Sequence, residues 1–292
     1  MQNYLRISKK SSNFAAAFAG SSSARLECLL WEQEVVSSNL AYPTRSHACG
    51  SFSLNIKHST LNIIVYKAIF IDIDDTLLDY VPCCREAFDV AMSQITNDQC
   101  QMSNEEQFDL FFSISGRLFS EAKRGLHTIA EVMELYPAEF CEKAGLGSEA
   151  VEPFKHAFRA AWGTTHTLVP GTIETLETLH SKGYRLFAAS NSFGHLQRSR
   201  LEKAGILSYF EDTYISMDIG YDKPDVRFYQ EALRRCNLQP HEVLMVGDSM
   251  TTDILGAKAA GLDTCFFDRR GEGTAKEDIL TITSLPELLK YV

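Results

Sequence analysis

Short runs of apolar residues, each ending in polar or acidic residues, recur along the chain from residue 66 onward. They occupy residues 66–73, 184–190, 213–217, 242–248 and 263–267. Runs of this length without apolar–polar alternation are typical of strands that are buried on both faces, as in parallel sheets. The pattern therefore predicts a parallel sheet that contains these five segments.

Helical periodicity separates most of these runs. Within residues 172–182, one helical face carries Ile173, Leu176 and Leu179. Pro224 suits the first position of a further helix, whose face toward the sheet would carry Phe228, Ala232 and Cys236. Alternating strands and helices with right-handed crossovers form a doubly wound, Rossmann-like α/β sheet, which is the predicted fold class.

Residues 80–166 break the alternation, because they contain helical stripes and no convincing strand. The pair Thr128 and Glu131 has the spacing of a capping box. The apolar stripes consist of Phe108, Phe111, Phe112, Ser115, Leu118, Phe119 and Ala122, and then of Phe154, Phe158, Ala161 and Trp162. We interpret these aromatic residues as the core of a helix bundle. The prediction is an all-helical cap at 80–166, inserted into an α/β core formed by 63–79 and 167–292.

The first 60 residues differ from the rest in composition. They are rich in Ser, Ala and Asn, lack a sustained helical or strand period, and carry six basic and three acidic residues. We therefore expect residues 1–62 to be a poorly ordered extension. Residues 1–26 are basic and contain no acid, as in a transit peptide. Alternatively, residues 34–40 (EVVSSNL) resemble the translated T-arm of a transfer-RNA gene, which would place the true start near Val65.

Charge and composition exclude several classes of function. The net charge of −10 argues against a nucleic-acid-binding surface, and no apolar run reaches the roughly 18 residues of a membrane-spanning helix. The eight cysteines form no CxxC pair or zinc pattern, which favours reduced thiols and a cytoplasmic location. The adjacent Cys83 and Cys84 are interpreted as half-buried helix residues.

Polar side chains gather where the predicted strands end. In chain order they are Asp72, Asp74, Ser190, Asn191, Lys223, Asp248 and Asp253. Ligands of open α/β sheets bind outside the carboxyl ends of the strands. We therefore expect these side chains to converge at one edge of the sheet and to form a binding site.

Four carboxylates at one edge require a cation, because they would otherwise repel one another and raise their own pKa values. Mg²⁺ takes carboxylate, water and phosphate oxygens as ligands. A carboxylate beside such an ion can attack phosphorus and form an acyl phosphate, while a second carboxylate transfers protons to the leaving alcohol and from water. The residues thus predict a magnesium-dependent phosphohydrolase in which Asp72 and Asp74 share these two tasks.

The motifs, in this order, resemble those of the haloacid dehalogenase-like hydrolase superfamily. Its DxDxT motif matches residues 72–76, its strand-closing Ser or Thr matches Ser190, and its GDxxxxD motif matches residues 247–253. The family lysine, often followed by Pro and Asp, matches Lys223. The resemblance covers about residues 66–292.

The resemblance implies the chemistry of the first motif. Asp72 would be the nucleophile and a magnesium ligand, and Asp74 the general acid/base, with its backbone carbonyl also facing the metal. Dehalogenases of the superfamily lack the second aspartate, and its ATPases carry a lysine where Ile73 stands. The resemblance therefore favours hydrolysis of a phosphate ester.

The other motifs receive roles by the same resemblance. Ser190, Asn191 and Lys223 would bind the phosphoryl group. Asp248 would be the other direct carboxylate ligand of Mg²⁺. Asp253 would act through a metal-bound water or by orienting Lys223.

The helical insertion resembles the cap of the subclass that acts on small substrates, which closes over the site and sets specificity. Residues 220–224 and 247–257 look most like members that act as 5′-nucleotidases, including pyrimidine-directed and house-cleaning enzymes. Lys123 is the cap lysine that a phosphonate hydrolase would use for a Schiff base, but we interpret it as a solvated surface residue.

We therefore expect a small phosphorylated metabolite, a nucleotide first of all, as the substrate, with no nucleic-acid or membrane partner and the oligomeric state open. Hydrolysis of a sugar phosphate or of phosphoglycolate is one alternative. A phosphomutase similar to β-phosphoglucomutase and a non-catalytic scaffold are the others.

Overall fold

The computed structural model describes residues 52–56, 59–63, 66–95, 100–271 and 279–292. Six strands form one parallel sheet in the order β5-β4-β3-β6-β7-β8. They are β3 (Ala68–Ile71), β4 (Arg185–Ser190), β5 (Asp212–Ile215), β6 (Val243–Gly247), β7 (Asp263–Phe267) and β8 (Leu280–Ile282). The α/β fold predicted from the apolar runs is thereby confirmed.

Two strands differ from the sequence prediction. Strand β5 ends at Ile215, because the chain turns there into the short helix α8 (Ser216–Ile219), so the predicted run to residue 217 was too long. Strand β8 was not predicted, since its three residues are too few to show a period.

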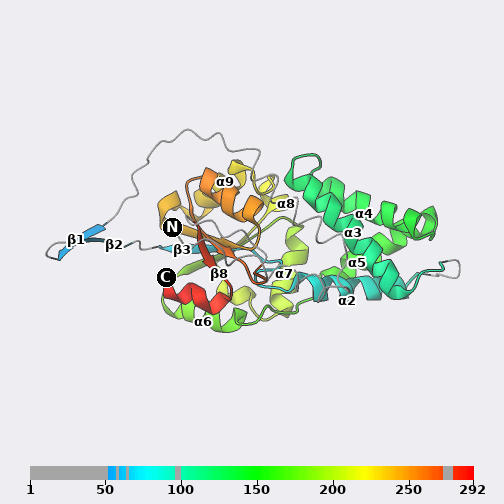
Figure 1. Cartoon of the computed structure of the whole chain (residues 1–292), viewed down its shortest axis with the longest axis horizontal. Helices are drawn as coiled ribbons and strands as arrows, with labels where there is room; N and C mark the ends of the chain where they lie inside the picture. Colours follow the sequence, from blue (N-terminus) through cyan, green and yellow to red (C-terminus); the bar gives the residue numbers. More distant parts are fainter. Residues whose placement is uncertain (1–51, 57–58, 64–65, 96–99, 272–278) are drawn as a thin grey trace, which may run out of the picture.

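Helices cover both faces of the sheet (Figure 1). On one face, α6 (Thr172–Ser181) and α7 (Gly194–Lys203) contribute side chains to an apolar core that contains Ile69 and Ile71. On the other, α8, α9 (Val226–Cys236) and α10 (Gly256–Ala259) pack on Phe70. Successive strand residues point to opposite faces, so the unbroken apolar runs fill both layers.

Two details of the predicted helices were wrong. Helix α9 begins at Val226 and not at Pro224, because the Asp225 carboxylate accepts the backbone N–H of Arg227 at 2.9 Å and caps the helix. On α6, Ile173 is 44% exposed. Leu176 and Leu179 are buried as predicted, but Thr172 and Thr175, and not Ile173, complete the stripe toward the sheet.

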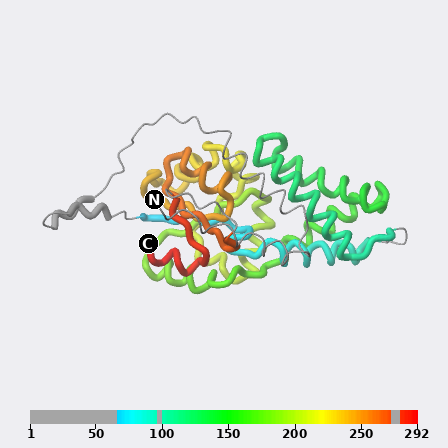
Figure 2. The backbone as a smooth tube through the Cα atoms, in the orientation of Figure 1, coloured from blue at the N-terminus to red at the C-terminus, as the bar shows by residue number. Residues whose placement is uncertain are grey.

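The inserted block forms a separate bundle at the right of Figure 1, made of α2 (Tyr80–Ser93), α3 (Asn104–Lys123), α4 (Ile129–Lys143) and α5 (Val151–Trp162). Its aromatic side chains pack on one another, with the Phe111 and Phe154 ring centroids 5.6 Å apart. Cys83 and Cys84 are fully buried in it, and not half-buried as predicted. Figure 2 shows the chain passing from the core into this bundle and back again.

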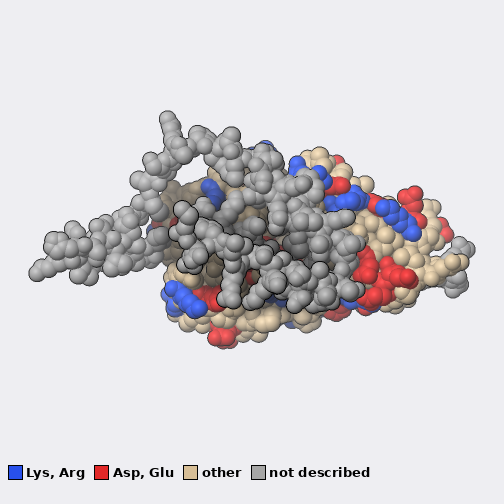
Figure 3. Space-filling model, in the orientation of Figure 1, with Lys and Arg blue, Asp and Glu red and all other residues tan. Residues whose placement is uncertain are grey.

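Short helical turns complete the molecule. They are the 3-10 helices η1 (Ser148–Ala150), η2 (Leu207–Tyr209), η3 (Pro240–Glu242) and η5 (Leu285–Lys290), and the π-helix η4 (Met250–Leu255). The described surface visible in Figure 3 carries basic side chains mixed with acidic ones. None of the helices among the described residues is long and apolar enough to cross a membrane.

Part of the predicted N-terminal extension has regular structure. Strands β1 (Phe52–Ile56) and β2 (Ser59–Ile63) pair antiparallel in a sheet of their own, with Phe52 opposite Ile63. These ten residues, of which nine belong to the predicted extension, therefore form two paired strands. The predictions for residues 1–51 lie outside the described residues.

Candidate active site

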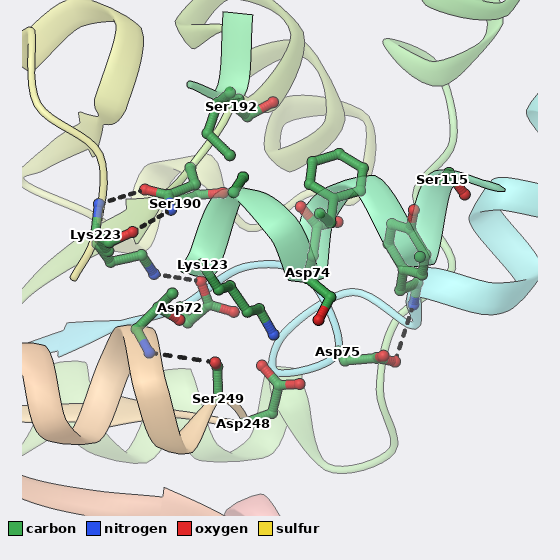
Figure 4. Close-up of a pocket in the computed structure, with 18 of the residues that line it drawn as sticks. Asp72, Asp74, Asp75, Ser115, Lys123, Ser190, Ser192, Lys223, Asp248 and Ser249 are labelled. Atoms are coloured by element: carbon green, nitrogen blue, oxygen red, sulfur yellow. Dashed lines mark hydrogen bonds and ion pairs between the residues drawn. The ribbon is translucent and has the colours of Figure 1, made fainter. Parts of the chain in front are cut away.

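The carboxyl ends of the two central strands bring Asp72 and Asp248 together (Figure 4). Asp72 follows β3, and its backbone N–H donates to the Val246 carbonyl on β6 at 2.9 Å. One carboxylate oxygen from each of Asp72, Asp248 and Asp253 lies within 4.8 Å of the others. The sequence predicted this convergence, and the pairing of β3 with β6 accounts for it.

Lys223 is buried at the centre of the site and is only 3% exposed. Its ammonium group donates to Asp72 Oδ1 at 2.7 Å, to Asp253 Oδ1 at 2.7 Å and to the Ala189 carbonyl at 2.8 Å. An ammonium group has three donors, so all of them are used. The lysine therefore holds a fixed charge beside Asp72.

Asp253 acts through its neighbours. Its Oδ1 accepts from Lys223, and its Oδ2 accepts the backbone N–H of Ser249 at 3.0 Å. A Cβ on Gly247 would approach Asp253 Oδ2 to 2.3 Å, so only glycine leaves room for this contact. The geometry corresponds to the alternative in which Asp253 orients the lysine.

Burial and mutual repulsion oppose ionisation of the carboxyl groups in the site. Burial, followed by the charge of Asp253, raises the pKa of Asp72 to about 7, although Lys223 counteracts the shift. Burial and the carboxylates of Asp72, Asp75 and Asp253 raise the pKa of Asp248 well above its usual range. Positive charge beyond that of Lys223 would stabilise the ionised forms.

These residues fit a divalent cation of the magnesium type. Mg²⁺ takes oxygen ligands and is commonly held by one or two carboxylates. Asp72 and Asp248 would supply them, and Asp253, whose two oxygens accept from Lys223 and from the Ser249 backbone, would hold the lysine. The side chain of Asp74 is not part of this cluster.

Asp74 is held by two residues of α7 that the sequence analysis did not single out. Arg200 Nη1 donates to its Oδ1 at 2.7 Å, and Gln197 Nε2 donates to its Oδ2 at 2.6 Å. The same Gln197 nitrogen lies 2.9 Å from Ser190 Oγ. The sequence carries one signal for these two residues, which is the polar composition of α7. Because this helix also packs on the core, some of its polar side chains must be buried.

The side chain of Asn191 contacts the protein backbone. Its Nδ2 donates to the Lys223 carbonyl, and its Oδ1 accepts the Lys223 backbone N–H, both at 2.8 Å. Its amide therefore fixes the loop that carries Lys223. A direct contact of Asn191 with a phosphoryl group stays a prediction.

A cavity joins these groups to the cap. On the cap side its walls include Phe112, Phe119, Trp162, Ser115 and Lys123. Lys123 is half-buried and reaches from the end of α3 toward the carboxylates (Figure 4), and its charge partly opposes the rise in the pKa of Asp248. The interpretation of Lys123 as a solvated surface residue was wrong, because the fold places the end of α3 over the site.

Comparison with known proteins agrees with this arrangement. The family model described as haloacid dehalogenase-like hydrolase matches residues 66–261. The chain therefore belongs to the haloacid dehalogenase-like hydrolases. Its relatives include phosphatases, which supports phosphatase activity of that family without specifying the substrate.

Three similar proteins illustrate the range of activities and the shared fold. A glyceraldehyde 3-phosphate phosphatase from Methanothermobacter thermautotrophicus is 32% identical over 67% of this chain and 83% of its own length. The pyrimidine 5′-nucleotidase PynA from Streptococcus pneumoniae is 27% identical over 70% of this chain and 84% of its own length. The magnesium-bound crystal structure of the putative hydrolase YfnB from Bacillus subtilis shares the fold, with a TM-score of 0.69 and 24% identity over 77% of this chain and 98% of that one.

Proposed function

We propose that this protein is a magnesium-dependent phosphatase that hydrolyses nucleoside 5′-monophosphates through a phosphoryl group on Asp72. The observation that carries the chemistry is the position of Asp72 between the Lys223 ammonium, at 2.7 Å, and the carboxylate of Asp248. This pair of neighbours supplies a fixed charge on one side and a second metal ligand on the other.

In the proposed mechanism an Asp72 oxygen attacks phosphorus, and the bond from phosphorus to the ester oxygen breaks. Asp74 gives a proton to that oxygen as it leaves. Asp74 then takes a proton from water, which attacks the phosphoryl group and frees Asp72. Lys223 and Ser190 would stabilise the charge on the phosphoryl oxygens.

Mg²⁺, when bound, would neutralise phosphoryl charge and favour the ionised form of Asp72. Asp72 and Asp248 would hold it, as the cluster of carboxylate oxygens suggests. The magnesium in the YfnB structure, a relative of the same fold, supports this assignment.

The cap favours a substrate with a flat, aromatic part. Phe112, Phe119 and Trp162 line the cavity, with the hydroxyl of Ser115 among them. Aromatic side chains stack on bases without regard to sequence, and the relative PynA is a pyrimidine nucleotidase. The relative that hydrolyses glyceraldehyde 3-phosphate makes a small sugar phosphate the rival substrate class.

Reduced thiols support the expected cytoplasmic location. The six cysteines among the described residues are all free, and five of them are buried. Proteins in oxidising compartments more often pair such residues.

A phosphate-release assay on the purified full chain tests the proposal. With Mg²⁺ we expect release from pyrimidine and purine 5′-monophosphates, and a decrease of at least about a thousandfold on Asp72→Asn, because the amide cannot act as the nucleophile. Release from glyceraldehyde 3-phosphate and other sugar phosphates, but from no nucleotide, would contradict the substrate class. Activity retained in the Asp72→Asn variant would contradict the mechanism.

A further inference from the structure

One buried arginine links the carboxylate of Asp74 to the end of the cap. Arg200 lies on α7 and its side chain is 0% exposed. Its Nη1 donates to Asp74 Oδ1 at 2.7 Å and to Gln197 Oε1 at 2.8 Å, and its Nε donates to the Thr165 carbonyl at 3.1 Å. Three segments that are distant in sequence thus meet at one guanidinium group.

The guanidinium group also stacks on the cap. Its Cζ lies 3.9 Å from the centre of the Trp162 ring, the last residue of α5, which also lines the active-site cavity. Such an arrangement is a cation–π contact. Thr165, only three residues further on, lies in the segment through which the chain returns from the cap to the core. Arg200 therefore contacts both the end of the cap and its return segment.

A purely structural role explains this arginine poorly. Burying a charge is costly unless it is paired, and an apolar side chain of similar size would pack on Trp162 without that cost. The Arg200 Nη2 is buried without a hydrogen-bond partner among the described residues. The strongest contact of the group is the ion pair to Asp74, whose side chain is still 24% exposed and faces the cavity.

We propose that Arg200 is a positioning residue for Asp74. It holds the carboxylate, together with Gln197, in the orientation needed for proton transfer, and it ties that orientation to the cap through Trp162 and Thr165. The inference rests on the proposed role of Asp74 as the general acid/base.

Asp74 is needed in some steps of the reaction but not in cleavage of an ester whose leaving oxygen is weakly basic. Breaking the ester bond to a basic leaving oxygen requires a proton from Asp74, whereas a nitrophenolate leaves without one. Attack of water on the phosphoryl group of Asp72 again needs Asp74, which accepts the proton as the bond from Asp72 to phosphorus breaks. A poorly held Asp74 therefore slows the first step only for basic leaving groups, and slows the second step always.

The test compares two aryl phosphates that differ in one nitro group. With Mg²⁺, kcat/KM is measured for p-nitrophenyl phosphate and phenyl phosphate in the wild type, Arg200→Met and Arg200→Lys. We expect the ratio of kcat/KM for p-nitrophenyl phosphate to kcat/KM for phenyl phosphate to rise about tenfold or more in Arg200→Met, since positioned acid–base groups contribute about 10²–10⁴-fold. Arg200→Lys keeps the charge, so its ratio should lie between those of the wild type and Arg200→Met. Arg200→Met should also release nitrophenol in a rapid burst before steady state, as phosphorylated enzyme accumulates.

Arg198→Met is the matched control. Arg198 lies on the same helix and pairs with Asp218 at 2.7 Å, outside the site, so its loss should leave the ratio unchanged. If Arg200→Met does not fold, Trp162→Phe provides a second test, because it weakens the cation–π contact and should raise the ratio by a smaller factor.

The outcomes distinguish the two proposals. A wild-type protein that hydrolyses neither aryl phosphate contradicts the proposed function itself. A wild-type protein that is active, with Arg200 variants that lose activity equally on both substrates and show no burst, overturns the positioning role.

Discussion

Among single residues, Asp72 and Asp248 share a site but not the same surroundings. Asp72 accepts a hydrogen bond from Lys223 at 2.7 Å, whereas the charge that opposes the pKa shift of Asp248 comes from Lys123 on the cap. Burial and neighbouring carboxylates raise the pKa of both groups. The metal-free site is therefore a region where folding is opposed by negative charge.

Removing one of these charges should stabilise the metal-free protein. We expect Asp248→Asn, in EDTA at pH 8, to raise the free energy of unfolding, because the amide removes a buried negative charge that the neighbouring carboxylates repel. The raised folded-state pKa means that wild-type stability falls as pH rises from the ordinary Asp value of about 4 through that pKa. Urea denaturation across this range measures the effect.

Two observations would contradict this prediction. The advantage of Asp248→Asn should shrink as the pH falls, and vanish below about 4, where the carboxyl group becomes protonated in both states; a constant difference would point to packing instead. Excess MgCl₂ should stabilise the wild type, through preferential binding to the folded state, and the variant much less. Equal stabilisation would mean that Asp248 is not a ligand.

Among the elements, the start of α4 illustrates how local sequence determines structure. Thr128 Oγ1 accepts the Glu131 backbone N–H at 3.2 Å, and the Thr128 backbone N–H donates to Glu131 Oε2 at 2.7 Å. The same reciprocal pair occurs at α3 between Ser103 and Glu106. Both boxes need only the spacing of two residues and no distant partner.

We expect Thr128→Ala to lower the free energy of unfolding by about 1 kcal/mol, the usual cost of losing such a cap. Chemical denaturation monitored by circular dichroism measures it. Ser103→Ala is the matched variant and should cost a similar amount. A change below about 0.3 kcal/mol in both variants would indicate that the helix starts are held by packing alone.

For the whole molecule, the contacts between cap and core connect substrate binding to the fold. The backbone N–H of Ile129, at the first position of α4, donates to Asp222 Oδ2 at 3.3 Å, one residue before Lys223. An acidic group there also interacts favourably with the helix dipole. A second contact joins α7 to the end of α5, where Ser199 Oγ donates to the Gly163 carbonyl at 2.7 Å.

Loss of the Asp222 contact should weaken closure of the cap over the substrate. We expect Asp222→Ala to raise KM roughly two- to fivefold, the equivalent of about 0.3–1 kcal/mol for a charge at a helix end, with kcat much less affected. Steady-state kinetics with the best substrate measures both constants. Asp225→Ala is the control, because Asp225 caps α9 within the core and should change stability but not KM. An unchanged KM in Asp222→Ala would contradict the role.

The sequence by itself determined the features that depend on near neighbours. The apolar runs predicted five of the six strands of the parallel sheet, the Thr128 and Glu131 spacing predicted a helix start, and the acids that end the strands predicted the cluster of Asp72 and Asp248. These inferences work because strand and helix periods are short and because parallel strands end at one edge.

Only the tertiary structure decided the contacts between distant segments. The contact of Arg200 with Asp74 joins residues 126 apart, and that of Asn191 with the Lys223 backbone joins residues 32 apart. Lys123 of the cap lines the same cavity as the carboxylates of the core. Hydropathy assigns such polar side chains to the surface by default. Their positions depend on how the cap packs over the sheet, because a buried charge is stable only where the fold brings its partner.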